Sequence, residues 1–227
     1  MDYWVENQRV VSYLVSFEVS FFDAYTSKLY LVNWTCHLGD IIYNSVMKKY
    51  IQVYEDVITK EQCDNLIQKF EVSKDQHVAT DLDNHRHFTE ININQHKDWS
   101  NQVQGVYSSL RPYVEKYKSD CNITDKQWPD EFGFEQIRFK RYLPNDRDEF
   151  KEHVDVGDYN SARRFLVFFL YLNDNFGGQT SFSEYNRQVL PRAGRLLMFP
   201  PTWTYLHTGH KPIKLPKYII GSYLHYL

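Results

Sequence analysis

The sequence predicts an α+β fold that is mainly β: a double-stranded β-helix, or jelly roll, with helices packed on one sheet. Helical segments come first, and after Pro129 short strands follow one another, separated by Pro, Gly, Asn and Asp. One of them, RFLVFFLYL at 164–172, is apolar after its first residue, as expected of a strand buried on both faces. A run of short strands after helices favours two packed sheets.

Residues 1–46 differ in composition from the rest of the chain. They hold 2 basic and 5 acidic residues, whereas residues 47–227 balance at 24 and 24. We expect an N-terminal appendage of unclear status before a domain over 47–227, or a reading frame extended upstream of a true start at Met47. A third interpretation is that this segment adds edge strands or a covering helix to the core.

The first half of the expected domain contains two helices. Residues 51–57 alternate like a strand, and Thr59 with Gln62 forms a capping box for a helix over 60–72. Residues 78–94 are polar and are expected to be a loop that ends in a short strand, TEINI. Apolar residues at helical spacing predict a long helix over 95–118.

The second half reads as strands throughout. The segments are FEQIRFKRYL, EFKEHVDV, RFLVFFLYL, TSFSEY, RQVLP, GRLLMFP, TYLHTG and KYIIGSYLHYL. We interpret Gly177 and Gly178 as a hairpin turn that returns the strand with Thr180 and Phe182 toward a site.

Composition excludes some classes of function. The net charge is −3, so no overall basic surface indicates a nucleic-acid partner. The most apolar stretch, residues 10–32, is interrupted by charges and does not predict a membrane span. The three cysteines, Cys36, Cys63 and Cys121, are widely spaced and odd in number, which favours a reducing cytoplasm.

A metal site is predicted from three residues. His153 and Asp155 are two apart, so in an extended strand they project from the same face. His207 on a facing strand would complete a two-histidine, one-carboxylate set, which is typical of non-haem Fe(II) oxygenases. His210 is the alternative to His207. A rival cluster lies in DLDNHRH, with members Asp81, Asp83, His85 and His87.

Four motifs in order resemble a known family. RYLPNDRDEFKEHVDV, FLYLNDNFGGQTSF, GRLLMFPPTWTYLHTG and KYIIGSYLHYL are similar to the core of 2-oxoglutarate/Fe(II)-dependent dioxygenases, in the branch of the prolyl 4-hydroxylase alpha subunit. The resemblance covers residues 51–227 and is densest over 134–227.

The resemblance implies roles for individual residues. His153, Asp155 and His207 would bind Fe(II), and Lys217 would pair with the distal carboxylate of 2-oxoglutarate, to which Tyr142 would donate its hydroxyl. Lys214 is the alternative cation. The cofactors implied are Fe(II), 2-oxoglutarate and O2, with ascorbate as reductant. The reaction would release succinate and CO2 and hydroxylate an unactivated C–H bond.

The substrate expected from the resemblance is a prolyl or similar side chain in a peptide or protein. Loops 75–95 and 143–152 would select it, and Arg163 or Arg164 would contact its backbone. One alternative is the same chemistry on an alkylated nucleobase or a free small molecule. A second is a non-catalytic jelly-roll binding module. Neither a nucleic acid nor a membrane is an expected partner.

Overall fold

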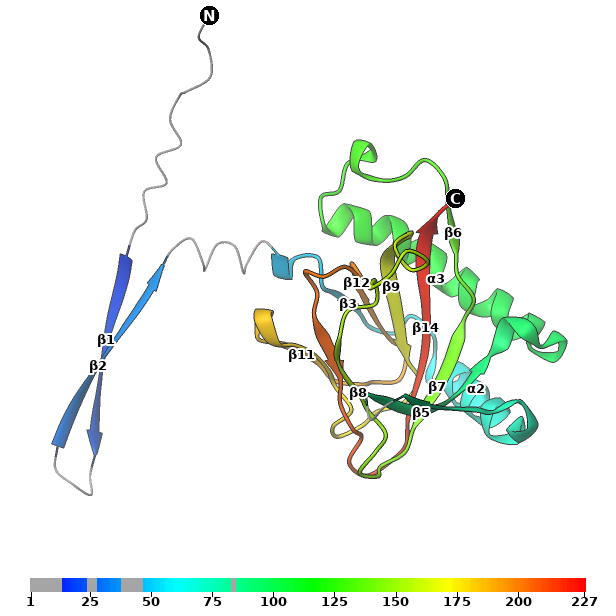
Figure 1. The fold of residues 1–227 in the computed structure, drawn as a ribbon, viewed down its shortest axis with the longest axis horizontal. Helices are drawn as coiled ribbons and strands as arrows, with labels where there is room; N and C mark the ends of the chain where they lie inside the picture. Colours follow the sequence, from blue (N-terminus) through cyan, green and yellow to red (C-terminus); the bar gives the residue numbers. More distant parts are fainter. Residues whose placement is uncertain (1–13, 24–27, 38–46, 83–84) are drawn as a thin grey trace, which may run out of the picture. The chain divides into compact units, whose positions relative to one another are not determined.

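The computed structural model describes residues 14–23, 28–37, 47–82 and 85–227. The chain divides into two compact units, residues 1–49 and 50–227. In the first unit, β1 (Leu14–Asp23) and β2 (Lys28–His37) pair antiparallel as a two-stranded sheet (Figure 1). The expected appendage over 1–46 and the start at Met47 stay predictions, and much of that segment lies outside the described residues.

The second unit is built on one large antiparallel sheet. Its strand order is β11-β10-β13-β8-β5-β7-β14-β9-β12-β3, with β4 added to β5 and β6 to β14. The strands are β3 (Gln52–Tyr54), β4 (Val78–Leu82), β5 (Arg86–Asn92), β6 (Phe132–Phe134), β7 (Arg138–Tyr142), β8 (Phe150–His153), β9 (Arg164–Tyr171), β10 (Thr180–Phe182), β11 (Arg187–Val189), β12 (Arg195–Phe199), β13 (His207–Gly209) and β14 (Lys217–Tyr226).

The sheet is curved and nearly closed, and β5 connects its two parts through β7 and β8 (Figure 1). Its pairing with β7 spans residues 89–92, whereas its pairing with β8 is the single pair Arg86↔Phe150. The four strands β8, β13, β10 and β11 therefore fold over the longer strands and enclose an interior. The jelly-roll fold class is confirmed.

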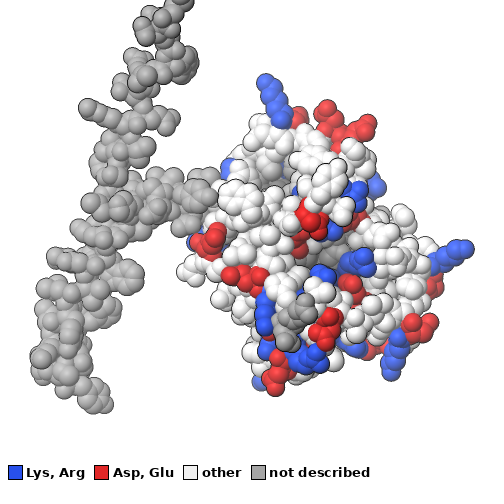
Figure 2. Space-filling view, viewed as in Figure 1, with Lys and Arg blue, Asp and Glu red and all other residues white. Residues whose placement is uncertain are grey.

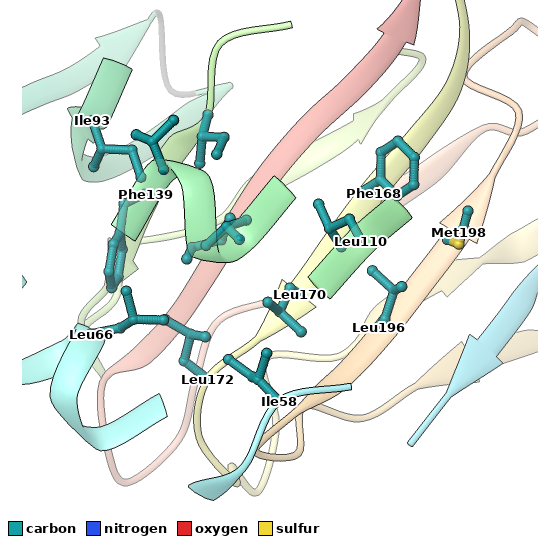
Figure 3. Packing of buried hydrophobic residues seen from close by; sticks show 14 of the residues in the cluster. Ile58, Leu66, Ile93, Leu110, Phe139, Phe168, Leu170, Leu172, Leu196 and Met198 are labelled. Atoms are coloured by element: carbon teal, nitrogen blue, oxygen red, sulfur yellow. The ribbon is translucent and has the colours of Figure 1, made fainter. Parts of the chain in front are cut away.

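Two helices cover the outer face of the long strands (Figures 1 and 3). They are α2 (Lys60–Val72) and α3 (Ser100–Asp120). On α3 the side chains at helical spacing are buried: Val103, Val106, Leu110, Val114 and Tyr117. They pack against outward-facing sheet residues such as Phe168, Leu170 and Leu196. Burial of this apolar surface is the main stabilisation of the unit.

Both helices form where the sequence predicts, with one shifted start. The α2 boundaries match the prediction, and Thr59 and Gln62 make the reciprocal capping bonds. The second helix begins at Ser100 instead of residue 95, because residues 93–95 and 97–99 form separate 3₁₀ turns.

Two strand predictions were wrong in part. The short strand expected at 89–93 forms within β5, up to Asn92, but the residues before it, expected as a loop, form β4 and the start of β5. These strands are held by pairing with each other and with β7, which the polar sequence does not indicate. The strand expected over 51–57 stops at Tyr54. Asp56 has φ +55, and the amide of Val57 donates to the carbonyl of Gly194.

Strand β9 lies between β14 and β12, in the middle of the sheet. Leu166, Phe168 and Leu170 belong to the helix-covered core, and Val167 on the opposite face is also buried. Burial on both faces explains its apolar sequence.

The described surface carries charges of both signs. Lys and Arg alternate with Asp and Glu on the face drawn in Figure 2, without a large area of one sign. Among the described helices, none has the length and apolar character needed to cross a bilayer.

Candidate metal centre

The three predicted metal ligands meet at one point inside the sheet. His153 ends β8 and is the direct antiparallel partner of His207, the first residue of β13. Asp155 follows two residues after His153. One ligand atom from each of the three residues lies within 4.8 Å of the others.

The atoms that face this point have no protein partner. His153 Nε2, His207 Nε2 and Asp155 Oδ2 are buried, and within the described part of the chain none makes a hydrogen bond. Asp155 Oδ1 lies 3.7 Å from His153 Nε2, and Asp155 Oδ2 lies 3.6 Å from His207 Nε2. Buried polar atoms are rarely left unsatisfied, so three that converge fit a divalent metal ion.

The opposite ring nitrogens fix the orientation of both imidazoles. His153 Nδ1 lies 2.6 Å from the carbonyl of Lys151, and His207 Nδ1 lies 3.0 Å from the carbonyl of Tyr205. A carbonyl accepts only, so each Nδ1 carries the proton and each Nε2 offers its lone pair to the centre.

Electrostatics keeps two of the ligands in the state that a metal requires. Burial lowers the pKa of His207 to about 4, against the opposing effect of Asp155. Burial alone would raise the pKa of Asp155, but His207, His153 and the Tyr223 hydroxyl together lower it to about 2. At neutral pH the imidazole of His207 is uncharged and the carboxylate of Asp155 is ionised.

Three residues that contact the candidate ligands were not given this role from the sequence. Tyr223 donates a hydrogen bond of 2.8 Å to Asp155 Oδ1, and Arg164 donates one of 3.2 Å to the Asp155 carbonyl. The ring of Phe150 stacks on His153 at a centroid distance of 3.4 Å. Even spacing along the last strand from Lys217 to Tyr223 was a usable signal for the tyrosine.

The centre opens into a pocket inside the sheet. Besides the three ligands, its lining is Lys140, Tyr142, Phe150, Phe169, Thr180, Gly209, Lys217, Ile219 and Gly221. Both cosubstrate residues predicted from the resemblance, Lys217 and Tyr142, therefore share one pocket with the candidate ligands.

Lys217 is buried at the far end of this pocket. It pairs with Tyr142 across β14 and β7, and its Nζ lies 4.1 Å from the centroid of the Tyr142 ring. The ammonium donates to the carbonyls of Gly178 at 3.1 Å and His210 at 3.3 Å. Burial, followed by the charge of Lys140, lowers the pKa of Lys217 to about 7.

The Tyr142 side chain is 4% exposed. Its hydroxyl makes no hydrogen bond to any residue that the structure describes, so it remains able to donate to a ligand. Burial raises the pKa of this hydroxyl well above its usual range, which keeps it protonated.

The predicted glycine turn contacts the buried lysine. Gly177 and Gly178 have φ of +102 and +64, which favour glycine. A Cβ on Gly178 would lie 3.0 Å from Cδ of Lys217, so the absence of a side chain makes room for the lysine stem. After the turn, Thr180 lines the pocket and shares a 2.6 Å hydrogen bond with Tyr171.

The alternatives considered for His207 and Lys217, which are His210 and Lys214, do not line the pocket. His210 bonds to the Ser181 hydroxyl at 2.7 Å, and Lys214 is exposed beside Phe176. In the rival cluster, His87 bonds to Asp148 and Asp81 to Arg147, while Asp83 lies outside the described residues. Of the residues described, the cluster of His153, Asp155 and His207 is the one group placed to hold a metal.

The two arginines considered for substrate contact differ in environment. Arg164 makes a two-point ion pair with Glu135, at 3.0 and 2.9 Å, and is committed to the structure around Asp155. The Arg163 side chain is 58% exposed and lies 3.9 Å from the same carboxylate.

Comparisons with known proteins agree with this site. Residues 137–225 match the family model of the 2OG-Fe(II) oxygenase superfamily, a segment that includes the three candidate ligands, Lys217 and Tyr142. A comparison with curated proteins gave no match. The match over residues 137–225, together with the site described above, supports a 2-oxoglutarate-dependent dioxygenase.

Three of the solved structures with the same fold are prolyl hydroxylases. A viral collagen prolyl hydroxylase from Paramecium bursaria Chlorella virus 1, in complex with 2-oxoglutarate, is 17% identical, with a TM-score of 0.57 over 78% of this chain and 96% of that one. A Trichoplax adhaerens prolyl hydroxylase, bound to a peptide fragment of the hypoxia inducible factor oxygen degradation domain, is 17% identical with a TM-score of 0.60, covering 82% and 90%. A Pseudomonas putida prolyl-4-hydroxylase is 14% identical with a TM-score of 0.56, covering 82% and 99%.

Proposed function

We propose that this dioxygenase hydroxylates a prolyl or similar side chain in a peptide or protein. His153, Asp155 and His207 would hold Fe(II). Lys217 would pair with the distal carboxylate of 2-oxoglutarate, to which Tyr142 donates its hydroxyl. The observation that carries the proposal is the convergence of three buried, unpartnered ligand atoms on one point of a pocket that ends at a buried lysine.

Bound Fe(II), together with 2-oxoglutarate and O2, would supply the oxidising power for hydroxylation and release succinate and CO2. The protein residues prepare the site for that chemistry. The two imidazoles present lone pairs in fixed orientations, and the Asp155 carboxylate offsets part of the metal charge. Phe169 and Ile219 form apolar walls that exclude water. Lys217 offsets the cost of burying the cosubstrate carboxylate.

A peptide substrate is supported by exposed aromatic side chains on the segments that follow Asp155 and precede His207 in the sequence. Tyr159 is 94% exposed and Trp203 is 79% exposed. The segments that carry them are joined where the amide of Val156, next to Asp155, donates to the carbonyl of Pro201. Aromatic faces suit contacts with the ring of a proline. Balanced charge outside residues 1–46 disfavours a polyanionic substrate.

Succinate release tests the roles of the site residues. With Fe(II), ascorbate and 2-oxoglutarate, the wild-type protein should release succinate even without substrate. His153→Ala should abolish this release, and Lys217→Ala should mainly raise the 2-oxoglutarate concentration required. Lys214→Ala, a lysine on the exposed surface, is the matched control and should behave like wild type. Turnover that persists in His153→Ala would refute the ligand assignment.

The substrate class needs a separate measurement. Peptides containing proline should gain one oxygen by mass spectrometry, whereas alkylated nucleobases and free amino acids, tested in parallel, should not. Oxygen gain on a nucleobase or small molecule and on no peptide would overturn the peptide proposal.

Two further expectations accompany this function. We propose ascorbate as the reductant, to be checked by whether its omission shortens the period of linear turnover.

We also propose a cytoplasmic location, supported by the buried Cys63 thiol, which forms no disulfide. Cell fractionation tests the location, and recovery in a secreted fraction would contradict it.

A further inference from the structure

A second lysine, Lys140, lines the pocket beside Lys217. Lys140 lies on β7, two residues before Tyr142, so the two side chains project from the same face of the strand. It lines the same pocket as the candidate metal ligands and Lys217. Across the sheet, Lys140 pairs with Ile219 of β14.

This register places Lys140 between the two ends of the pocket. Along β14, Lys217 marks the far end, while Tyr223 bonds to Asp155 at the metal end. Ile219, opposite Lys140, lies between them on the same face. The side chain of Lys140 points toward the metal end. Its Nζ lies 6.0 Å from the centroid of the Phe150 ring, which stacks on His153.

The Lys140 ammonium has aromatic neighbours and no acceptor. Its Nζ lies 4.8 Å from the centroid of Phe88. Among the residues that the structure describes, it makes no hydrogen bond and no salt bridge. Glu90 is opposite Lys140 in the pairing of β5 with β7, yet the cation within 4 Å of its carboxylate is Arg138, at 3.8 Å. An ammonium has three donors, and with no protein acceptor in the described chain those of Lys140 are available to an anionic group in the pocket.

Two lysine ammonium groups in one pocket also repel each other. Burial is the main cause of the lowered pKa of Lys140, with Glu90 and Asp155 opposing it and Arg86 and Arg138 adding to it. Lys140 in turn lowers the pKa of Lys217. Within the described residues neither lysine has a carboxylate in salt-bridge distance, and two lysines that share a pocket in this way favour an anionic ligand.

We propose that Lys140 is a second cosubstrate contact, which binds the carboxylate of 2-oxoglutarate nearer the metal while Lys217 binds the distal one. Two ammonium groups then face the two carboxylates of one dianion. The proposal concerns the cosubstrate and is independent of the peptide substrate proposed above.

Binding of two ligands to Mn(II)-loaded protein, without peptide, tests the proposal by calorimetry. The ligands are 2-oxoglutarate and 2-oxovalerate, which has the same carbon chain but lacks the distal carboxylate. Lys140→Met should weaken binding of both ligands by a similar factor, about tenfold or more, because both keep the carboxylate near the metal. Lys217→Met should weaken 2-oxoglutarate and leave 2-oxovalerate unchanged. Lys214→Met, on the exposed surface, should change neither.

Three outcomes would overturn the proposal. Unchanged affinity of Lys140→Met for both ligands would exclude a cosubstrate contact. Selective loss of 2-oxoglutarate would assign Lys140 to the distal carboxylate instead. Mn(II) affinity is also measured for each variant. If weaker Mn(II) binding explained the entire loss of ligand affinity in Lys140→Met, Lys140 would have a structural role only. Should Lys140→Met not fold, Lys140→Gln replaces it. Failure of the wild type to bind either ligand would instead contradict the cosubstrate itself.

Discussion

The hydroxyl of Tyr223 donates a 2.8 Å hydrogen bond to Oδ1 of Asp155, while Oδ2 of the same carboxylate has no partner within the described chain. One oxygen is thus fixed by the protein and the other is left for a ligand. Burial keeps the pKa of the Tyr223 hydroxyl well above its usual range, so it stays a donor at all relevant pH values. The tyrosine therefore orients the carboxylate that the metal centre depends on.

Replacing Tyr223 by Phe should weaken metal binding. The change removes the donor and retains the ring, so Asp155 loses its orientation with little change in packing. Loss of such an outer contact costs about 10- to 100-fold in metal affinity. Mn(II) titration measures the effect. Tyr226→Phe, on a side chain that is 51% exposed, is the control. Equal affinity in Tyr223→Phe and wild type would show that the bond has no such role.

Replacing Lys217 by Met should stabilise the ligand-free protein at pH 7. The pKa of Lys217 is lowered to about 7 in the folded state, below its usual 10.5. The unfolded chain therefore binds this proton more tightly than the folded protein. The resulting loss of folding stability is complete below pH 7 and disappears as the pH rises to 10.5. We expect a gain on the order of 1–3 kcal/mol at pH 7 after loss of the two carbonyl hydrogen bonds. Chemical denaturation should show a smaller difference in the free energy of unfolding between variant and wild type at pH 9 than at pH 7.

The affinity for 2-oxoglutarate should fall as the pH rises above 7. In the ligand-free protein Lys217 loses its proton near pH 7, and binding of the distal carboxylate would require the charged form. The dissociation constant should rise by up to about tenfold per pH unit until the pKa of the bound form is reached. Calorimetry between pH 6.5 and pH 9 checks this, and 2-oxovalerate should show a shallower dependence. Parallel slopes for the two ligands would assign the titration to another group.

Replacing Gly178 by Ala should disturb the cosubstrate end of the pocket. The residue has φ +64, and its new Cβ would lie 3.0 Å from Cδ of Lys217. We expect a stability loss of about 1–2 kcal/mol and weaker 2-oxoglutarate binding. Gly105→Ala is the matched control, because nothing lies within 4 Å of its Cβ position on α3. It should raise stability by up to about 1 kcal/mol and leave ligand binding unchanged.

Truncation of Leu110 should destabilise the whole unit. This side chain of α3 is 1% exposed within the core between helix and sheet. Leu110→Ala should lower the free energy of unfolding by about 2–5 kcal/mol, measured by denaturant titration. Arg111→Ala, on the exposed side of the same helix, should stay within about 0.5 kcal/mol of wild type. Similar stability of the two variants would show that packing of this face of α3 contributes little.

The sequence predicted the elements whose signal is local. The α2 helix follows from its capping box and apolar spacing, and β9 from its continuous apolar run. The polar hairpin over 78–92 was predicted as a loop except for its last residues, because its strands depend on pairing with each other and with β7. The strand over 51–57 ended early for a similar reason, a long-range bond from Val57 to Gly194.

By itself, the sequence indicated the kind of chemistry, because the types and spacing of His153, Asp155, His207 and Lys217 match those that a metal ion and 2-oxoglutarate require. Only the tertiary structure decided which other side chains reach that point. Contacts between Tyr223 and Asp155, and the position of Lys140, arise from strand register across β7, β14 and the loop after β8. Register is set by pairing between distant segments, so it leaves no mark in any single stretch of sequence.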